Sequence, residues 1–99
     1  MNCNAWVEHM FRLWLKEWKN SRLVKDTVVE NDERDTRTHK VLRGLEEGCR
    51  RFDLPVPIWL DSSIRDFQRH AGCRFTQDAF IEEIDFDYLE IQVIEEDLY

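Results

Sequence analysis

The sequence predicts a single small α+β domain, a sheet of about four strands with two helices packed on one face. Its 99 residues suffice for one modest core and are too few for two. Apolar residues alternate with polar ones near both ends of the chain, which is typical of strands with one buried face. Between these regions apolar residues recur at the spacing of amphipathic helices. The predicted order of elements is β-β-α-β-α-β.

The chain is predicted to open with a hairpin made of residues 10–18 and 22–30. Apolar and polar side chains alternate along the first of these segments. A helix over residues 5–18 also suits the apolar positions there. The turn-like residues 19–22 and the Val- and Thr-rich run after them favour the hairpin.

The first predicted helix follows a polar loop whose end offers three helix-capping residues, Asp35, Thr36 and Thr38. Gly44 and Gly48 weaken this helix but would allow it to pack closely on the sheet. A segment with two prolines ends it. Its apolar stripe consists of Val41, Leu42, Leu45, Cys49 and Phe52.

A short third strand is predicted at residues 58–60, followed by a second helix that Asp61 or Ser62 caps and Gly72 ends. The last strand lies within residues 80–98. The inward positions are Ile64 and Phe67 of the second helix, with Leu89, Ile91 and Val93 of the last strand.

Charge is divided unevenly along the chain. Residues 1–75 hold all 14 Lys and Arg against 12 acidic residues, whereas residues 76–99 hold nine acidic residues and no basic one. Nucleic acid is therefore an unfavourable partner for the whole surface, because phosphate binding depends on basic charge. The acidic end predicts a basic protein partner.

Composition predicts a cytoplasmic protein. Cys3, Cys49 and Cys73 are an odd number without close pairing, which favours free thiols in a reducing compartment. No apolar run approaches the roughly 20 residues that span a bilayer, and no basic and then apolar segment opens the chain. We therefore expect no membrane association.

Two stretches of the sequence carry a resemblance to a known family. The run DTRTHKVLRGLEEGCRRFDLPVPIWLDSSIRDFQRHAGCRF (residues 35–75), with FIEEIDFDYLEIQVIEED (residues 80–97), resembles a family of small bacterial proteins of about 90 residues with no assigned activity. The resemblance implies a compact fold that begins near Met10 and supplies no catalytic residue. We expect residues 1–9 to be an extension that frays from a domain spanning residues 10–99.

If both helices cover one face of the sheet, the opposite face is free to meet another molecule. That face would carry Arg12, Phe86 and Gln92 among several aromatic residues, and exposed aromatic patches mark contact sites. The sequence thus predicts a protein-binding module that acts on a protein partner or as a homodimer. The predicted partner-binding residues are Trp14, Lys16, Trp18, Asp85, Asp87, Tyr88 and Glu90.

Enzyme chemistry is the alternative. His70 and Cys73 have the short spacing of half a zinc site or of an activated thiol, although a buried cysteine and a helix-end histidine explain the same pattern. Asp85, Asp87 and Glu90 would suit a divalent metal. Neither pattern is complete, so the sequence assigns no catalytic residue, metal ligand or cofactor and favours a non-enzymatic protein.

Two further interpretations depend on charge. A small acidic inhibitor could mimic nucleic-acid charge and compete for a basic target. Arg65, Arg69 and Arg74 form a basic stripe that could pair with the acidic end of the same chain or of a symmetry mate.

Overall fold

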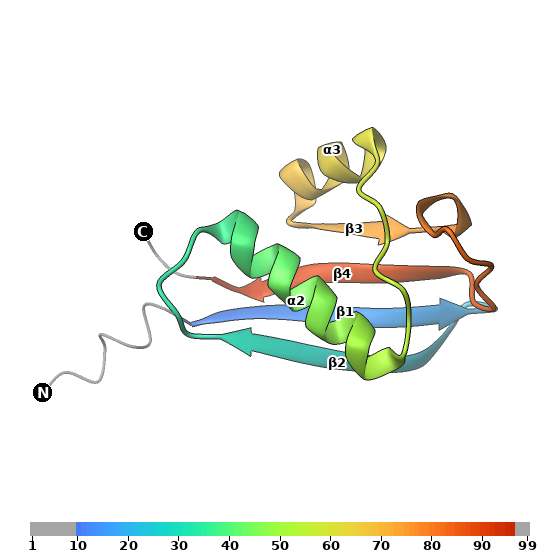
Figure 1. Ribbon diagram of the computed structural model, residues 1–99, viewed down its shortest axis with the longest axis horizontal. Helices are drawn as coiled ribbons and strands as arrows, with labels where there is room; N and C mark the ends of the chain where they lie inside the picture. The colour runs from blue at the N-terminus through green and yellow to red at the C-terminus, as the bar shows by residue number, and fades with distance from the viewer. Residues whose placement is uncertain (1–9, 97–99) are drawn as a thin grey trace, which may run out of the picture.

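The computed structural model describes residues 10–96, which form a four-stranded sheet with one helix over a face and a second helix beside an edge strand (Figure 1). The predicted α+β class and the single compact domain are confirmed. The predicted fraying of residues 1–9 concerns residues outside this described part. The elements are β1 (Phe11–Lys19), β2 (Arg22–Asn31), α2 (Arg37–Phe52), α3 (Asp61–His70), β3 (Gly72–Phe75), the 3-10 turn η1 (Gln77–Ala79) and β4 (Tyr88–Glu95).

The sheet has the order β2-β1-β4-β3, and all neighbouring strands are antiparallel. The predicted opening hairpin is confirmed as β1 and β2. Its turn residues Asn20 and Ser21 have left-handed φ angles of 54° and 63°, the backbone that matches the twist of paired strands. Strand β1 therefore lies inside the sheet, between β2 and the acidic β4.

Helix α2 packs closely on β1 because its two glycines leave room for leucines of the strand. A Cβ at Gly44 would lie 2.8 Å from Cδ2 of Leu13, and one at Gly48 would lie 2.6 Å from Cδ1 of Leu15. Both leucines are fully buried. The side of β1 that carries them is thus the inner face of the sheet, as the predicted role of the glycines requires.

The N-terminus of α2 is capped by Thr36, one of the three predicted candidates. Its hydroxyl accepts a hydrogen bond from the backbone N–H of His39 at 3.2 Å. Asp35 accepts from the His39 ring and from the N–H of Thr36, and these hydrogen bonds hold the pKa of the Asp35 carboxyl below its usual value. The predicted apolar stripe of α2 is buried except for Leu42, which is 40% exposed.

The prediction of a third strand at residues 58–60 is wrong. Pro57 precedes the segment and has no N–H, and the N–H of Ile58 donates to the carbonyl of Ala79 at 2.7 Å, outside any strand ladder. Strand β3 is Gly72–Phe75 instead, after α3, so the order is β-β-α-α-β-β. Gly72 begins this strand and does not end α3 as predicted, because Ala71, with a left-handed φ of 55°, is the C-cap. The predicted cap by Asp61 or Ser62 is also wrong, since the N-cap of α3 is Leu60 and no side chain caps it.

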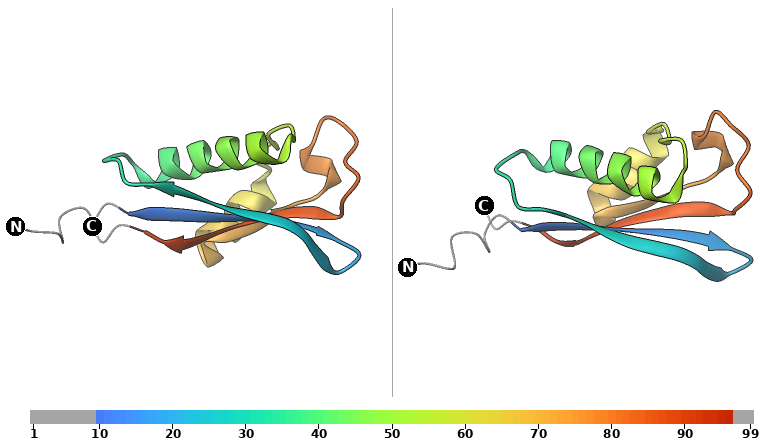
Figure 2. Two further views of the ribbon diagram at one scale, coloured as in Figure 1. Left: turned by 90° about the horizontal axis from the view of Figure 1, so that it is seen from below. Right: turned by 60° about the horizontal axis from the view of Figure 1, so that its bottom comes forward.

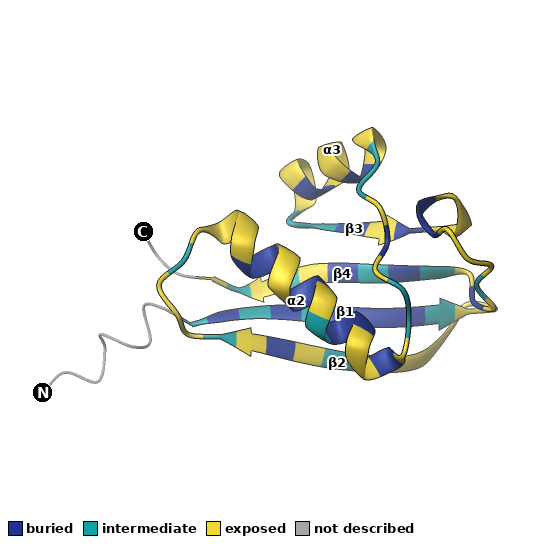
Figure 3. Cartoon of the chain, viewed as in Figure 1, coloured by how far each residue is buried: buried dark blue, intermediate teal, exposed yellow. Residues whose placement is uncertain are grey.

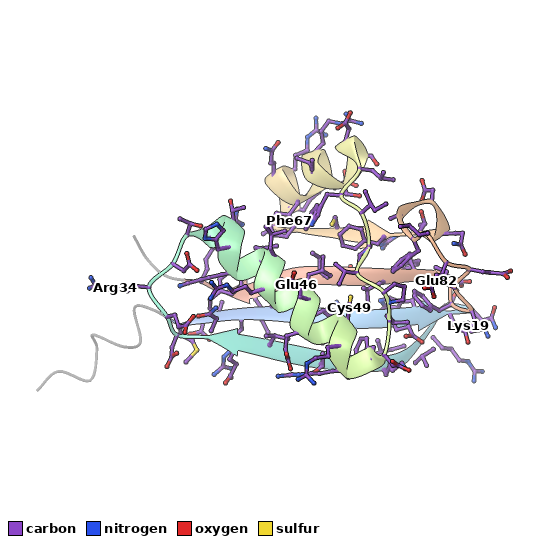
Figure 4. All side chains as sticks on the ribbon, viewed as in Figure 1. Lys19, Arg34, Glu46, Cys49, Phe67 and Glu82 are labelled. Carbon is purple, nitrogen blue, oxygen red and sulfur yellow. The ribbon has the colours of Figure 1, made fainter. Side chains whose placement is uncertain are left out.

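The core lies between the inner face of the sheet and the helices. Figure 3 shows buried and more exposed residues alternating along β4 and the first half of β1, as expected for a sheet with one covered face. Trp59 joins α3 to the sheet, because its ring packs edge-on against Phe67 and Phe75, with ring centroids 5.7 and 5.0 Å away. Phe67 reaches from α3 towards α2 (Figure 4).

Phe86 belongs to this core and not to the free face on which the sequence places it. It is 6% exposed and packs edge-on against Phe80 at 5.8 Å. It precedes β4, so the alternation of that strand does not apply to it. Neither helix of the described chain has the length and apolar content needed to cross a bilayer.

Candidate protein-binding face

We call the side of the sheet that points away from α2 the outer face. Leu13 and Leu15 of β1 contact α2, so alternation directs the intervening side chains to the opposite side. Figure 2 shows α2 lying over one side of β1 and β2. Helix α3 borders the outer face at β3 and β4, where Asp66 and His70 line a cavity of about 390 Å³ with Arg74, Glu90 and Gln92. The outer face consists of Arg12, Trp14, Lys16 and Trp18 of β1, Asp26, Val28 and Glu30 of β2, Arg74 of β3, and Tyr88, Glu90, Gln92 and Glu95 of β4.

The two tryptophans of this face are half-buried, and their indole N–H groups are satisfied within the sheet. Trp14 Nε1 donates to Asp26 Oδ2 at 2.8 Å, and Trp18 Nε1 donates to Glu90 Oε1 at 2.9 Å. The rings of Trp18 and Tyr88 lie side by side, with centroids 6.4 Å apart. These hydrogen bonds orient the rings, and cations of the same chain pack on two of them: Lys16 Nζ lies over the Trp14 ring, and Arg74 Cζ is 4.8 Å from the centroid of the Tyr88 ring.

Lys16 lies at the centre of the outer face and is only 8% exposed, because its neighbours cover it. Its Nζ atom is 3.9 Å from the centroid of the Trp14 ring, 3.4 Å from Gln92 Oε1 and 3.6 Å from Glu90 Oε1. The aromatic ring and the two oxygens compensate for the water that the ammonium group loses. The side chain of Lys16 is therefore packed into the outer face.

Charged residues of alternating sign form a row across all four strands at the position of Lys16. In the strand register, Lys16 is opposite both Asp26 and Glu90, and Glu90 is opposite Arg74. From β2 to β3 the order is acid, base, acid, base. Opposite charges on directly opposed strands stabilise the pairing by roughly 0.2–1 kcal/mol each.

A second set of charges lies near the start of β1. Arg12 Nε is 3.1 Å from Glu30 Oε2 and 3.2 Å from Glu95 Oε1. In both ion pairs between β1 and β4, Arg12 with Glu95 and Lys16 with Glu90, the cation lies on β1 and the carboxylate lies on β4. The acidic charge of β4 is partly matched inside the chain, which leaves fewer of its carboxylates free to imitate a nucleic acid.

The structure separates the seven predicted partner-binding residues into two groups. Trp14, Lys16, Trp18, Tyr88 and Glu90 share the outer face, whereas the remaining two do not. Asp85 and Asp87 are exposed in the segment before β4, at the end of the molecule where Figure 4 labels Lys19 and Glu82.

Asp87 has a local structural contact. Its Oδ2 atom accepts the N–H of Asn20 at 2.8 Å, and its own N–H donates to the carbonyl of Trp18 at 2.8 Å. It therefore ties the hairpin turn to the start of β4. The sequence could not separate this role from partner binding, because both predict an exposed acidic residue.

The thiol alternative is disfavoured by burial. Cys49 is fully buried and Cys73 is 7% exposed, and burial raises the pKa of each thiol to about 12. Asp66 raises the pKa of Cys73 further by its negative charge. His70 and Cys73 line one cavity of about 390 Å³ beside β3, but the thiolate that nucleophilic chemistry requires is suppressed there.

The metal alternatives lack a ligand set in the described chain. Within residues 10–96 no three His, Cys, Asp or Glu side chains come together as they would around a metal ion. Glu90 accepts from Trp18 on the outer face, whereas Asp87 accepts from Asn20 at the hairpin turn. Glu90 and Asp87, two of the three predicted metal-binding carboxylates, therefore make separate contacts within the chain.

Asp26, Val28 and Arg74 are members of the outer face that sequence reasoning did not select. Strand register decides their place, and register between strands far apart in the chain is not visible in one sequence. The hairpin turn alone does not place Asp26 either, because a β-bulge between Glu17 and Trp18 shifts the register so that Asp26 lies opposite Lys16 and not opposite Leu15.

Comparisons of the chain with protein-family models, with curated proteins and with solved structures gave no match. Any function must therefore be argued from the geometry above.

Proposed function

We propose that this protein is a non-enzymatic protein-binding or regulatory module that acts through the outer face. The observation that supports the proposal is the group of Trp14, Trp18 and Tyr88, whose side chains lie on the side of β1 and β4 that points away from α2. Trp, Tyr and Arg are the residues that dominate binding energy at protein interfaces. Their hydrogen bonds hold these side chains in place before binding, which lowers the entropy that binding must remove.

The acidic end of the chain belongs to the same proposal. Residues 76–99 carry nine acidic residues and no basic one, a distribution that favours a basic surface on the partner. The partner is a basic protein or a second copy of this chain, in the cytoplasm, where the free thiols of Cys49 and Cys73 would persist. The resemblance to small bacterial proteins adds no site residue.

Replacing Trp14 and Trp18 together by Ser tests the proposal. We expect the doubly substituted chain to lose association, in light scattering or in capture of a partner, because the apolar ring surface is removed. Replacing Leu42 and Ile64 by Ser is the matched control, since these residues are 40% and 41% exposed on the helix side. Circular dichroism would verify that both variants are folded. Association that survives the tryptophan substitutions would reject the outer face as the contact surface.

A further inference from the structure

The outer face has a pattern that is complementary to itself. Along β1 its side chains are cations and tryptophans, whereas the opposed positions of β4 hold carboxylates, an amide and a tyrosine. β1 and β4 are the two inner strands of the sheet. The opposed pairs, β1 residue first, are Arg12 and Glu95, Trp14 and Gln92, Lys16 and Glu90, and Trp18 and Tyr88.

A twofold axis that lies in the plane of the interface and runs between β1 and β4, along the strands, places β1 of one copy over β4 of another. Lys16 then faces Glu90 of the second copy, and Arg12 faces its Glu95. Trp18 faces Tyr88 of the second copy. The same rotation places β2 of one copy over β3 of the other, because these are the two edge strands. Asp26 then faces Arg74, so every facing pair in this row joins an acid to a base.

We propose that the partner of the outer face is a second copy of this chain, packed face to face about this axis. The inference rests on the proposed function, since it requires the outer face to be the contact surface. An isologous interface needs a patch that is complementary to itself, and a row of alternating charges with an even number of members meets this condition. Two sheets with aromatic faces pack in this way at about 10 Å separation.

The apolar rings and the charges have different tasks in this arrangement. Burial of Trp14, Trp18 and Tyr88 drives association, as aromatic side chains do at interfaces. The charges set the register. If β1 of one copy lay over β1 of the other, Lys16 and Arg12 would face the same cations of the second copy and repel them. The ion pairs of Lys16 with Glu90 and of Arg12 with Glu95 persist within each chain, and each of these charges gains a second partner across the interface.

The first measurement is the mass of the wild-type protein by light scattering at concentrations up to about 1 mM. We expect a concentration-dependent rise from the 12.1 kDa of one chain to twice that mass. A monomer throughout would overturn the self-association proposal, while the wider proposed function would be judged separately by whether the tryptophan substitutions abolish capture of a different protein.

Complementary charge reversals test the axis. In Lys16→Glu homodimers the introduced carboxylate would face Glu90 of the other copy, and in Glu90→Lys homodimers two lysines would meet, so each variant alone should dissociate about tenfold more readily or worse. In an equimolar mixture each reversed residue faces its opposite charge, and a heterodimer should form. Contacts within one chain are not restored by mixing, so rescue reports contacts between copies.

Failure of the mixture to recover the dimer mass would overturn this arrangement, and so would a dimer that neither reversal weakens. Glu47→Arg with Arg50→Glu is the control, because it reverses an exposed ion pair on α2, away from the outer face. If a reversal prevents folding, wild-type chains with and without ¹³C labels provide the test. Nuclear Overhauser effects between Trp18 and Tyr88 rings of different copies are expected, and their absence in a dimer would contradict the proposal.

Discussion

Leu15 of β1 occupies the space that Gly48 of α2 leaves free. Its Cγ atom would be 2.9 Å from a Cβ at residue 48, and it is fully buried. Gly48→Ala should therefore destabilise the fold by about 1–3 kcal/mol through overpacking, more than the gain of roughly 1 kcal/mol from higher helix propensity. Urea unfolding measures the difference.

Gly44→Ala is the comparison for this substitution, because its Cβ would meet Leu13 at 2.8 Å with only one atom closer than 3.0 Å. We expect a smaller cost there. A Gly48→Ala variant as stable as the wild type would show that the helix can shift away from the strand without loss.

Glu17 is a carboxylate on the inner face, 6% exposed, and within residues 10–96 its Oε1 atom accepts no hydrogen bond. Desolvation raises the pKa of this carboxyl above its ordinary 4.5, although Lys25, with Nζ 3.8 Å away, opposes the shift. The folded state thus holds the proton to a higher pH than the unfolded state does. Stability should fall as the pH rises from about 4.5 through the folded-state pKa.

Glu17→Gln removes this ionisation. The free energy of unfolding of the variant, measured relative to the wild type, should therefore rise as the pH is raised from about 4 to about 7. Unfolding by urea at both pH values gives the difference in free energy. Glu46→Gln on the exposed side of α2 (Figure 4) is the matched control for loss of one carboxylate. If the difference in unfolding free energy between Glu17→Gln and the wild type is the same at both pH values, the raised pKa of Glu17 is contradicted.

The cysteines give a direct test of the enzyme alternative. With a pKa of about 12 for Cys49 and Cys73, roughly one thiol in 10,000 is ionised near pH 8. Iodoacetamide should modify both residues only after unfolding in urea, as peptide mass spectrometry would show. Rapid modification of Cys73 in the folded protein would restore the thiol hypothesis.

At the scale of elements, the N-terminus of α2 depends on one side chain. Thr36→Ala removes the hydroxyl that accepts the N–H of His39, and we expect a loss of about 1 kcal/mol in the free energy of unfolding. Thr36→Ser retains the acceptor and should restore most of the stability. Equal effects of the two substitutions would show that the cap contributes little.

Elements with a long, regular pattern could be predicted from the sequence, and short ones could not. The hairpin, both helices and the last strand follow from apolar periodicity. Residues 58–60 and residues 72–75 are both short segments with apolar side chains, and only tertiary pairing distinguishes them. Residues 72–75 pair with β4, whereas residues 58–60 follow a proline and instead supply Trp59 to the core.

At the scale of the whole molecule, most of the outer face was predictable because alternation fixes which side chains share a side of a strand. Trp14, Lys16 and Trp18 were found in this way. Its self-complementarity was not predictable, because that depends on β4 being the neighbour of β1 and on their register. A single sequence contains no local signal for either property.

The charge of the whole molecule and the charges of the outer face act in opposite directions when two copies meet. Each chain carries a net charge of −7, so two copies repel each other over long distances at low salt. This repulsion is screened once the Debye length falls to about 8–10 Å, near 0.1–0.15 M. The close pairs of Lys16 with Glu90 and of Arg12 with Glu95 are screened less and weaken mainly at higher salt.

We therefore expect dimerisation to strengthen as NaCl rises from about 0.01 M to about 0.15 M and to weaken again towards about 1 M. Sedimentation equilibrium across this range measures the dissociation constant at each salt concentration. The Lys16→Glu and Glu90→Lys mixture should show the same two-phase dependence, because its facing charges are still opposite. A dissociation constant that falls steadily up to the highest salt would mean that apolar contact alone holds the copies together, since only the repulsion would then respond to salt.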